Sequence, residues 1–317
     1  MTNPVIYIKN NLLTLKVRKN PNSTEACVFL FTNGSGERRA SRIPTIAFGI
    51  LFLSLAAGLC AQEVLRVSGA TTIQPAAERA AAIFSDIVGG TVLVQGGGSG
   101  AGIRDTRAGT SAVGMVSRAL TPAELSDLIA ITYGFDALVF IVNRANPLDE
   151  ISLADVRRLY SGQVRTWDAL GGWDQAVVLV NKEIGRATLD LFEGYSGVAH
   201  PNRPQAGPAG RVDPGAYEIA SNLEAMTLVG GIPGAIGYVS MGAAESLIDA
   251  GMPIKVLRLD GVRASAATLA DGSYPILREL NLVVREETER TRAYTDLFFG
   301  PDIRSFIQAS GVVPADR

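Results

Sequence analysis

The sequence predicts an α/β fold in which a mostly parallel sheet is flanked by helices. From Glu63 onward, short apolar runs alternate with segments of helical periodicity. The chain has 317 residues, and its hydrophobic content of 47% is enough for one large core or for two. Turns rich in Gly, Ser and Thr stand where several of the runs give way to helices. In such sheets, ligands bind at the carboxyl ends of the strands.

The first part of this region is predicted to alternate regularly between strands and helices. Each expected strand is a short apolar run, and each expected helix has apolar residues at helical spacing. The expected strands are Val64–Val67, Thr91–Val94, Ala112–Val116 and Ala137–Asn143. The expected helices are Gln74–Phe84, Ser99–Arg107 and Pro122–Leu128. This order predicts parallel strands joined by helical crossovers.

The second part continues with mixed elements. The expected helices are Leu153–Tyr160, Arg186–Tyr195, Tyr217–Val229, Thr291–Phe299 and Asp302–Ala309. The further apolar runs are Val177–Val180, Ala235–Ser240, Ile254–Leu259 and Leu280–Val284. The segment Gly197–Gly215 is rich in Pro and Gly, so we expect a surface loop there. The sequence shows no internal repeat and no low-complexity tract.

Residues 1–61 are predicted to be an N-terminal extension followed by a secretory signal peptide. Arginines at 38, 39 and 42 precede the apolar core Ile43–Leu59, and small residues follow it. A basic patch, an apolar run and then small residues is the layout of a signal peptide, and an uncleaved anchor is the alternative. We expect cleavage after Ala61 and a periplasmic protein. Because Leu59 stands where a lipoprotein has a small residue, we do not expect a lipid anchor on Cys60.

Charge and composition exclude several classes of function. Of the 29 Lys and Arg and 31 Asp and Glu residues, 22 and 29 lie in residues 62–317, which gives this part a net charge of −7. A protein region with this much negative charge is a poor nucleic-acid binder. Both cysteines, Cys27 and Cys60, lie in the leader, and the sole histidine, His200, is expected on a surface loop. We therefore expect no metal site, no cofactor and no thiol chemistry.

Four turns carry the strongest functional signal. They are SGATTIQP (68–75), QGGGSGAGI (95–103), Ser117-Arg118, and NKEIGRATLDLF (181–192). Each stands where a strand gives way to a helix, and the free N–H groups of a helix start attract anions. Any one of these turns alone is most simply explained as a helix cap. Because strand ends meet at one edge of a sheet, the four together predict an anion site.

Nucleotide and enzyme motifs fit the sequence poorly. A Walker A loop needs Gly-Lys-Ser/Thr, which does not occur. Gly96, Gly98 and Ala101 match the loose dinucleotide-binding pattern, with Arg118 placed for a 2′-phosphate, but the match is weak. The sequence also lacks H-E-x-x-H, G-x-S-x-G and S-x-x-K arrangements. We therefore do not expect an enzyme.

Six motifs form a set, in this order along the chain: SGATTIQP, GGGSGAGI, GMVSRAL, a Lys-Glu-x-Gly turn, GAIGYVSM and YPILREL. This set resembles the PstS-type phosphate-binding proteins of ABC importers, a branch of the periplasmic binding proteins, over roughly residues 63 to 310. The resemblance implies a type II-like fold of two α/β lobes that are joined by crossing strands and close over one phosphate. The implied lobes are 62–140 with 236–317, and 141–235.

The resemblance also implies a set of ligand-binding residues, which offer amides, hydroxyls and cations to the anion. They are Ala70, Thr71, Thr72, Gly98, Ser99, Gly100, Ser117, Arg118, Lys182, Gly185, Arg186, Ala187 and Thr188. The fourth turn departs from the family pattern, because Lys182, Arg186 and Ala187 replace the usual Arg, Ser and Gly. We expect Arg186 to replace a lost cation from a shifted position.

The expected function is binding of inorganic phosphate and its delivery to the membrane subunits of an ABC importer, by a monomer. Sulfate or molybdate binding, a secreted phosphatase-like or NADP-dependent enzyme, and a scaffold that has lost its site are the alternatives. A carboxylate that accepts the proton of phosphate would favour phosphate over sulfate. Glu183 is our first candidate for this acceptor and Asp105 the second. We interpret Arg278 as part of a hinge ion pair.

Overall fold

The computed structural model describes residues 13–19, 26–32, 64–171 and 173–317. The chain divides into two compact units, residues 1–63 and 64–317. In the first unit, β1 (Leu13–Lys19) pairs antiparallel with β2 (Ala26–Thr32). The expected signal peptide with its apolar core 43–59, and Cys60, lie outside the described residues. Among the described residues, no helix has both the length and the apolar character needed to cross a bilayer.

The second unit is built on one mixed sheet with the order β4-β3-β5-β13-β6-β10-β8-β9. Its strands are β3 (Leu65–Gly69), β4 (Val92–Gly96), β5 (Val113–Val116), β6 (Ile129–Asn143), β8 (Val178–Lys182), β9 (Tyr217–Ile219), β10 (Ala235–Ser240) and β13 (Leu277–Val284). β3 runs parallel to β4 and β5, and β8 runs parallel to β9 and β10. The two inner strands, β6 and β13, are antiparallel to their neighbours, so the sheet is parallel only towards its two ends.

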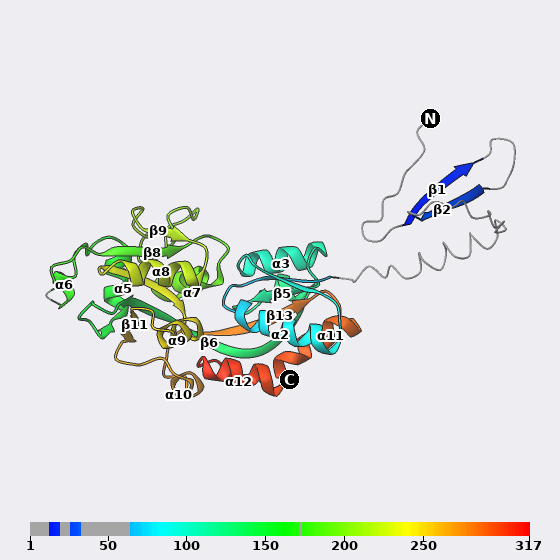
Figure 1. The fold of residues 1–317 in the computed structure, drawn as a ribbon. Helices are drawn as coiled ribbons and strands as arrows, with labels where there is room; N and C mark the ends of the chain where they lie inside the picture. The colour runs from blue at the N-terminus through cyan, green and yellow to red at the C-terminus, as the bar shows by residue number, and fades with distance from the viewer. Residues whose placement is uncertain (1–12, 20–25, 33–63, 172) are drawn as a thin grey trace. The chain divides into compact units, whose positions relative to one another are not determined.

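Two hydrophobic cores divide this unit into two lobes. The first lobe surrounds a core that includes Val67, Phe84 and Tyr294, and the second lobe surrounds one that includes Trp167, Phe192 and Tyr238. β6 and β13 pass from one core to the other and pair along their length (Figure 1). The α/β class and the crossing strands are therefore as the sequence predicted.

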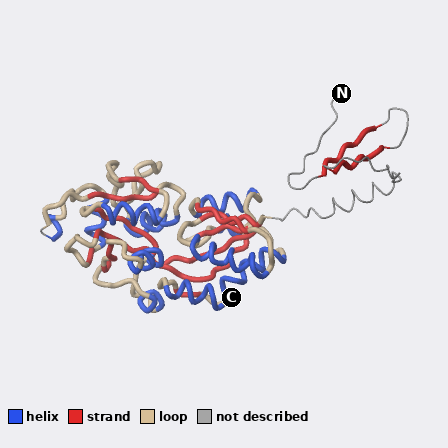
Figure 2. Tube along the Cα trace, viewed as in Figure 1, coloured by secondary structure: helices blue, strands red, loops and turns tan. Residues whose placement is uncertain are grey.

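Helices flank the strands of both lobes (Figure 2). In the first lobe they are α2 (Gln74–Ile87), α3 (Ser99–Ala108), α4 (Pro122–Leu125), α11 (Glu289–Asp296), η1 (Leu297–Phe299) and α12 (Pro301–Ala309). In the second lobe they are α5 (Leu153–Tyr160), α6 (Asp168–Gly171), α7 (Ala187–Ser196), α8 (Asn222–Gly231), α9 (Met241–Asp249) and α10 (Ala266–Ala270). Short strands β7 (Glu150–Ile151) and β12 (Arg258–Leu259) pair with each other, while β11 (Ile254–Val256) and β14 (Val313–Pro314) pair with β6.

Some sequence predictions of elements were wrong. The segment expected as one helix from Tyr217 to Val229 begins as strand β9, because Ser221 caps a helix that starts only at Asn222. Ser221 accepts from the backbone of Glu224, whose carboxylate returns the bond, and this capping box sets the helix start. Helices α9 and α10 were not predicted. β6 also begins earlier than expected. Its first half is not predicted from the sequence, because it is only partly buried and lacks a continuous apolar run.

The loop between Gly197 and Gly215 corrects the expectation for His200. Its side chain is buried, with 1% of the residue exposed. Nδ1 of His200 accepts from the backbone N–H of Asn202 at 3.1 Å, and Nε2 lies 3.0 Å from a carboxylate oxygen of Glu218. The loop therefore folds around the histidine instead of exposing it, although Pro and Gly dominate its sequence.

The chain stays in the second lobe well beyond residue 236. Residues of the segment 236–276, such as Val239 and Tyr274, pack in the core of the second lobe. After residue 236, the first residue that belongs to the core of the first lobe is Leu280. We therefore place the return crossing at β13, and not near residue 236 as we expected from the sequence.

Candidate functional site

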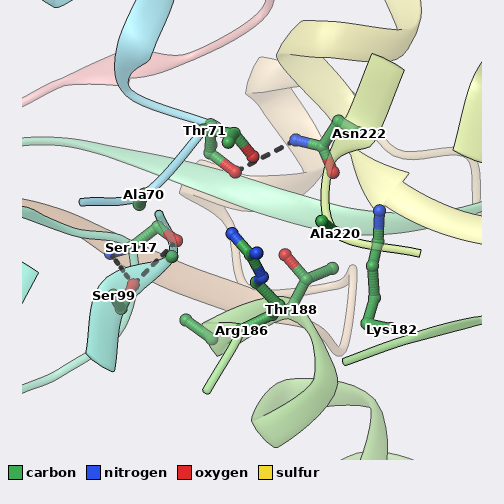
Figure 3. A pocket seen from close by; sticks show the side chains of 12 residues that line it. Ala70, Thr71, Ser99, Ser117, Lys182, Arg186, Thr188, Ala220 and Asn222 are labelled. Carbon is green, nitrogen blue, oxygen red and sulfur yellow. Dashed lines mark hydrogen bonds between the residues drawn. The ribbon is translucent and has the colours of Figure 1, made fainter. Parts of the chain in front are cut away.

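One pocket collects residues from all four small-residue turns (Figure 3). Its lining residues are Ala70, Thr71, Thr72, Gly98, Ser99, Ser117, Lys182, Arg186, Ala187, Thr188, Ala220 and Asn222. The turns therefore converge, as strand ends in such a sheet should. The cavity is about 10 Å³, room for about one water molecule. A larger ligand requires the lobes to part or Arg186 to move.

The glycine-rich turn is shaped by close backbone contacts. Gly98 precedes α3 with φ of 85°, in the region that favours glycine, and no side chain caps the helix. A Cβ at Gly98 would lie 2.9 Å from the carbonyl oxygen of Gly185 in the second lobe. A Cβ at Gly102 would lie 2.7 Å from the carbonyl oxygen of Met115. The glycines thus permit both the packing of α3 on the sheet and the approach of the second lobe.

Two buried serines form the floor of the pocket on the first lobe. Ser99 is 1% exposed and Ser117 is 2% exposed. The Ser99 hydroxyl accepts from the backbone N–H of Ser117 at 3.0 Å, and the two hydroxyl oxygens are 3.5 Å apart. The Ser99 oxygen accepts one bond, and its proton can be donated to the Ser117 hydroxyl or to an acceptor in the pocket.

The second lobe supplies the cations. Lys182 ends β8, is 2% exposed, and its Nζ donates to the carbonyl of Ser221 at 2.6 Å. Burial is the main cause that lowers the pKa of Lys182 to about 7; the nearby cations Arg278 and Arg186 contribute to the shift, and Glu224 opposes it. Arg186 precedes α7 and is mostly buried. The Arg186 side chain reaches towards the turns of the first lobe, whereas the Lys182 side chain reaches towards Ala220 and Asn222 (Figure 3). None of the lining residues is a carboxylate.

Three of the expected site residues do not line the pocket. Gly100 and Gly185 instead contact each other across the cleft, where the N–H of Gly100 donates to the carbonyl of Gly185 at 3.2 Å. The Arg118 guanidinium turns away and donates two bonds of 2.8 Å to the carboxylate of Glu124. Arg118 also lies 3.8 Å from Asp190 of the second lobe. The structure therefore places Arg118 at the rim, because Glu124 offers it a bidentate partner.

Replacing Arg118 with Gln is expected to lower stability and to leave ligand affinity nearly unchanged. Hydrogen bonds from Arg118 lower the pKa of Glu124 to about 2, against burial, and the backbone of Thr121 adds to the effect. Because this pKa lies below its ordinary value of 4.5, the stabilisation is present above pH 4.5 and is lost as the pH falls towards 2. Urea unfolding at pH 7 should show a loss of about 1–2 kcal/mol that disappears in acid.

The exposed Arg104, on the neighbouring helix α3, provides the matched control for this measurement. Its replacement with Gln should change neither the stability nor its pH dependence. If Arg118→Gln instead loses ligand affinity at unchanged stability, Arg118 belongs to the ligand contacts after all.

The carboxylates considered as proton acceptors are also outside the pocket. Glu183 pairs with Arg186 at 2.8 Å and its side chain is 42% exposed. Asp105 accepts from the hydroxyl of Ser68 at 3.1 Å and lines a separate pocket. Neither residue is placed to receive a proton from a ligand among the lining side chains. Among the described residues, no group of His, Cys, Asp and Glu could hold a metal ion.

The sequence reasoning missed Ala220 and Asn222, which line the pocket before and after Ser221. The amide of Asn222 donates to the hydroxyl of Thr72 at 3.1 Å and so links the two lobes. The local signal was Ser221 with Glu224 three positions later, which is a capping box and marks a further helix start. The helix predicted from Tyr217 to Val229 conceals this start, because it places Ser221 in the helix interior.

Most of the chain is similar to a known family of proteins. The family model of the PBP superfamily domain matches residues 55–302. The phosphate-binding protein PstS of Bacillus subtilis is 28% identical over 256 residues, which cover 79% of this chain and 80% of that protein. The phosphate-binding protein PstS of Borreliella burgdorferi is 23% identical over 234 residues, covering 72% of this chain and 81% of that one.

Solved structures share the fold. An ABC-type phosphate transport receptor from Vibrio cholerae has a TM-score of 0.62 and 25% identity, covering 78% of this chain and 99% of the receptor. A protein of Clostridium perfringens, assigned as a phosphate ABC transporter substrate-binding protein and crystallised with bound phosphate, has a TM-score of 0.71 and 24% identity. The match covers 80% of this chain and 100% of that protein. These likenesses extend over both lobes and the strands that join them.

Proposed function

We propose that this chain, which belongs to the PBP superfamily, binds inorganic phosphate between its lobes and delivers it to an ABC importer. The observation that carries the proposal is the pocket between the lobes. Hydroxyls and helix starts line it from the first lobe, and two cations, Lys182 and Arg186, line it from the second. The phosphate-binding proteins named above support the choice of ligand.

The donors in the pocket are sufficient for tight binding without a strongly basic protein. Micromolar affinity corresponds to about 8 kcal/mol. Each charge-assisted hydrogen bond contributes about 1.5–3 kcal/mol. Removing water from the anion and closing the lobes offset part of the sum. The net charge of −7 over residues 62–317 therefore does not oppose anion binding, since local geometry supplies the attraction.

Calorimetric titration of the full chain with phosphate, sulfate and molybdate tests the proposal. We expect micromolar or tighter binding of phosphate. Tighter binding of sulfate or molybdate than of phosphate would identify a binding protein for another oxyanion. Heat signals from none of the three anions would indicate a fold that has lost this site.

The hydroxyl of Ser99 should contribute directly to the affinity. Replacing Ser99 with Ala removes a buried donor at the start of α3, so the loss should be about 1–3 kcal/mol of phosphate binding. Ser111→Ala is the matched control, since Ser111 is also buried in the first lobe but bonds Ser68 away from the pocket. Equal phosphate affinity in Ser99→Ala and the parent would show that phosphate does not bind in this pocket.

The proposal extends to the context of the protein. Its cellular place is the periplasm, since the order of basic, apolar and small residues before Glu63 predicts export. Its partners are the membrane subunits of an importer, and it acts as a monomer. A binding role is favoured over a phosphatase-like one, because the lining residues include no cysteine, histidine or carboxylate to act as nucleophile or base.

A further inference from the structure

Arg278 lies at the junction between the lobes and contacts two residues that line the pocket. It lies on β13 and is the register partner of Asp136 on β6, so both crossing strands contribute to the pair. The side chains of Arg278 and Asp136 are both 0% exposed. Nε and Nη2 of Arg278 donate to Asp136 at 2.9 and 2.6 Å. The hydroxyl of Ser240 donates to the same carboxylate at 2.7 Å.

The remaining donors of Arg278 reach one pocket hydroxyl in each lobe. Nη2 donates to the hydroxyl oxygen of Thr72 in the first lobe at 3.2 Å. Nη1 donates to the hydroxyl oxygen of Thr188 in the second lobe at 3.1 Å. Both threonines line the pocket. One planar side chain therefore contacts the two faces that close over the ligand.

These contacts determine which way the hydroxyl protons point. A hydroxyl has one donor and two acceptor positions. The Thr72 oxygen accepts from both Arg278 and Asn222, so both its acceptor positions are used. The Thr188 oxygen accepts from Arg278, so its proton must point away from the guanidinium. Both hydroxyls are left as donors, which suits an anion oxygen that carries no proton.

We propose that Arg278 is a positioning residue that directs the hydroxyl protons of Thr72 and Thr188 to unprotonated oxygens of a tetrahedral anion. The inference rests on the proposed function, since it assumes such an anion in the pocket. Arg278 acts by orienting these hydroxyls and not by its charge, because Asp136 compensates that charge. The charge of the ligand is met instead by Lys182 and Arg186.

A mutant cycle on phosphate affinity tests this coupling. Arg278→Lys keeps a cation beside Asp136 but loses the fork that reaches both hydroxyls. A second form, Arg278→Gln with Asp136→Asn, removes both charges and avoids a buried unpaired carboxylate. Each of these two Arg278 variants is combined with Thr188→Val, which removes the hydroxyl. Thr188→Ser, which retains the hydroxyl, serves as the control. Calorimetry gives the affinities, and melting curves confirm that each variant folds.

We expect Thr188→Val to weaken phosphate binding about tenfold in the parent. In either Arg278 background the same change should cost less than about threefold, because the hydroxyl is no longer oriented. Thr188→Ser keeps the hydroxyl and should therefore lose clearly less phosphate affinity than Thr188→Val. A freed hydroxyl can accept the proton of phosphate, whereas sulfate has none to give. The ratio of phosphate to sulfate affinity should therefore rise in the Arg278 variants, which a merely structural role of Arg278 would not produce.

The outcomes separate the two proposals. A parent protein that binds no phosphate overturns the proposed function, and the role of Arg278 with it. If the parent binds phosphate but the losses from the Arg278 and Thr188 changes are additive, with an unchanged phosphate-to-sulfate ratio, only the role of Arg278 is overturned.

Discussion

Replacing Gly98 with Ala should reduce phosphate affinity about a hundredfold or more, the largest loss expected from any single methyl group in this protein. The added Cβ would lie 2.8 Å from Cδ of Arg186 and 2.9 Å from the carbonyl oxygen of Gly185. The first contact is with a flexible side chain, but the second is with backbone of the opposite lobe. The lobes must therefore separate, and the donors on the two lobes can no longer contact one anion together.

The backbone strain of Gly98→Ala needs its own control. Gly98 has φ of 85°, which is unfavourable for alanine wherever it occurs. Gly89 has φ of 78° and no atom within 4 Å of an added Cβ, so Gly89→Ala carries the strain without the collision. Gly98→Ala should lose at least as much stability as Gly89→Ala in thermal unfolding, and only Gly98→Ala should lose binding. Parent-like affinity in Gly98→Ala would show that the ligand-bound lobes do not approach this closely.

Replacing Lys182 with Met should reduce phosphate affinity about tenfold to a hundredfold, because it removes a buried cation from the pocket. Burial lowers the pKa of Lys182 to about 7, so much of the ligand-free protein carries a neutral amine at pH 8. A bound anion favours the charged form and raises this pKa. Phosphate binding at pH 8 should therefore take up a proton, and at pH 6 much less.

Calorimetry at pH 8 in two buffers of different ionisation enthalpy measures this proton uptake. The parent should take up most of one proton and Lys182→Met close to none. Lys255→Met is the matched control, since Lys255 pairs with the exposed Asp149 away from the pocket. Equal proton uptake in the parent and in Lys182→Met would show that another group supplies the linkage.

The same shift changes the stability of the ligand-free protein. Between about pH 7 and 10.5 the unfolded chain holds the lysine proton and the folded protein does not. The free energy of unfolding therefore gains a contribution from Lys182 that rises with pH over this window. Urea unfolding of Lys182→Met should lack that rise.

The local features of this protein follow from short stretches of its sequence. Helix α3 starts at Ser99, as predicted, directly after a run of glycines. Helix Leu153–Tyr160, which Ser152 caps, and strand Ala235–Ser240 have the bounds that the sequence predicted. These features depend on interactions within a few residues, such as capping and apolar periodicity. Most of the expected site residues line one pocket for the same reason, since each belongs to a turn at a strand end.

The pairing of distant residues depends on the packing of the whole fold. Arg118 and Glu183 have side chains suited to a ligand site, yet their strongest partners are Glu124 and Arg186. The contact of Asn222 with Thr72 joins residues 150 positions apart, and no local pattern predicts such a pair. The same holds for Arg278 with Asp136, whose meeting depends on the register of the two crossing strands. Because a charged or polar group is satisfied by whichever partner the packing brings near, its role follows from the fold, whereas a turn or a cap follows from its own residues.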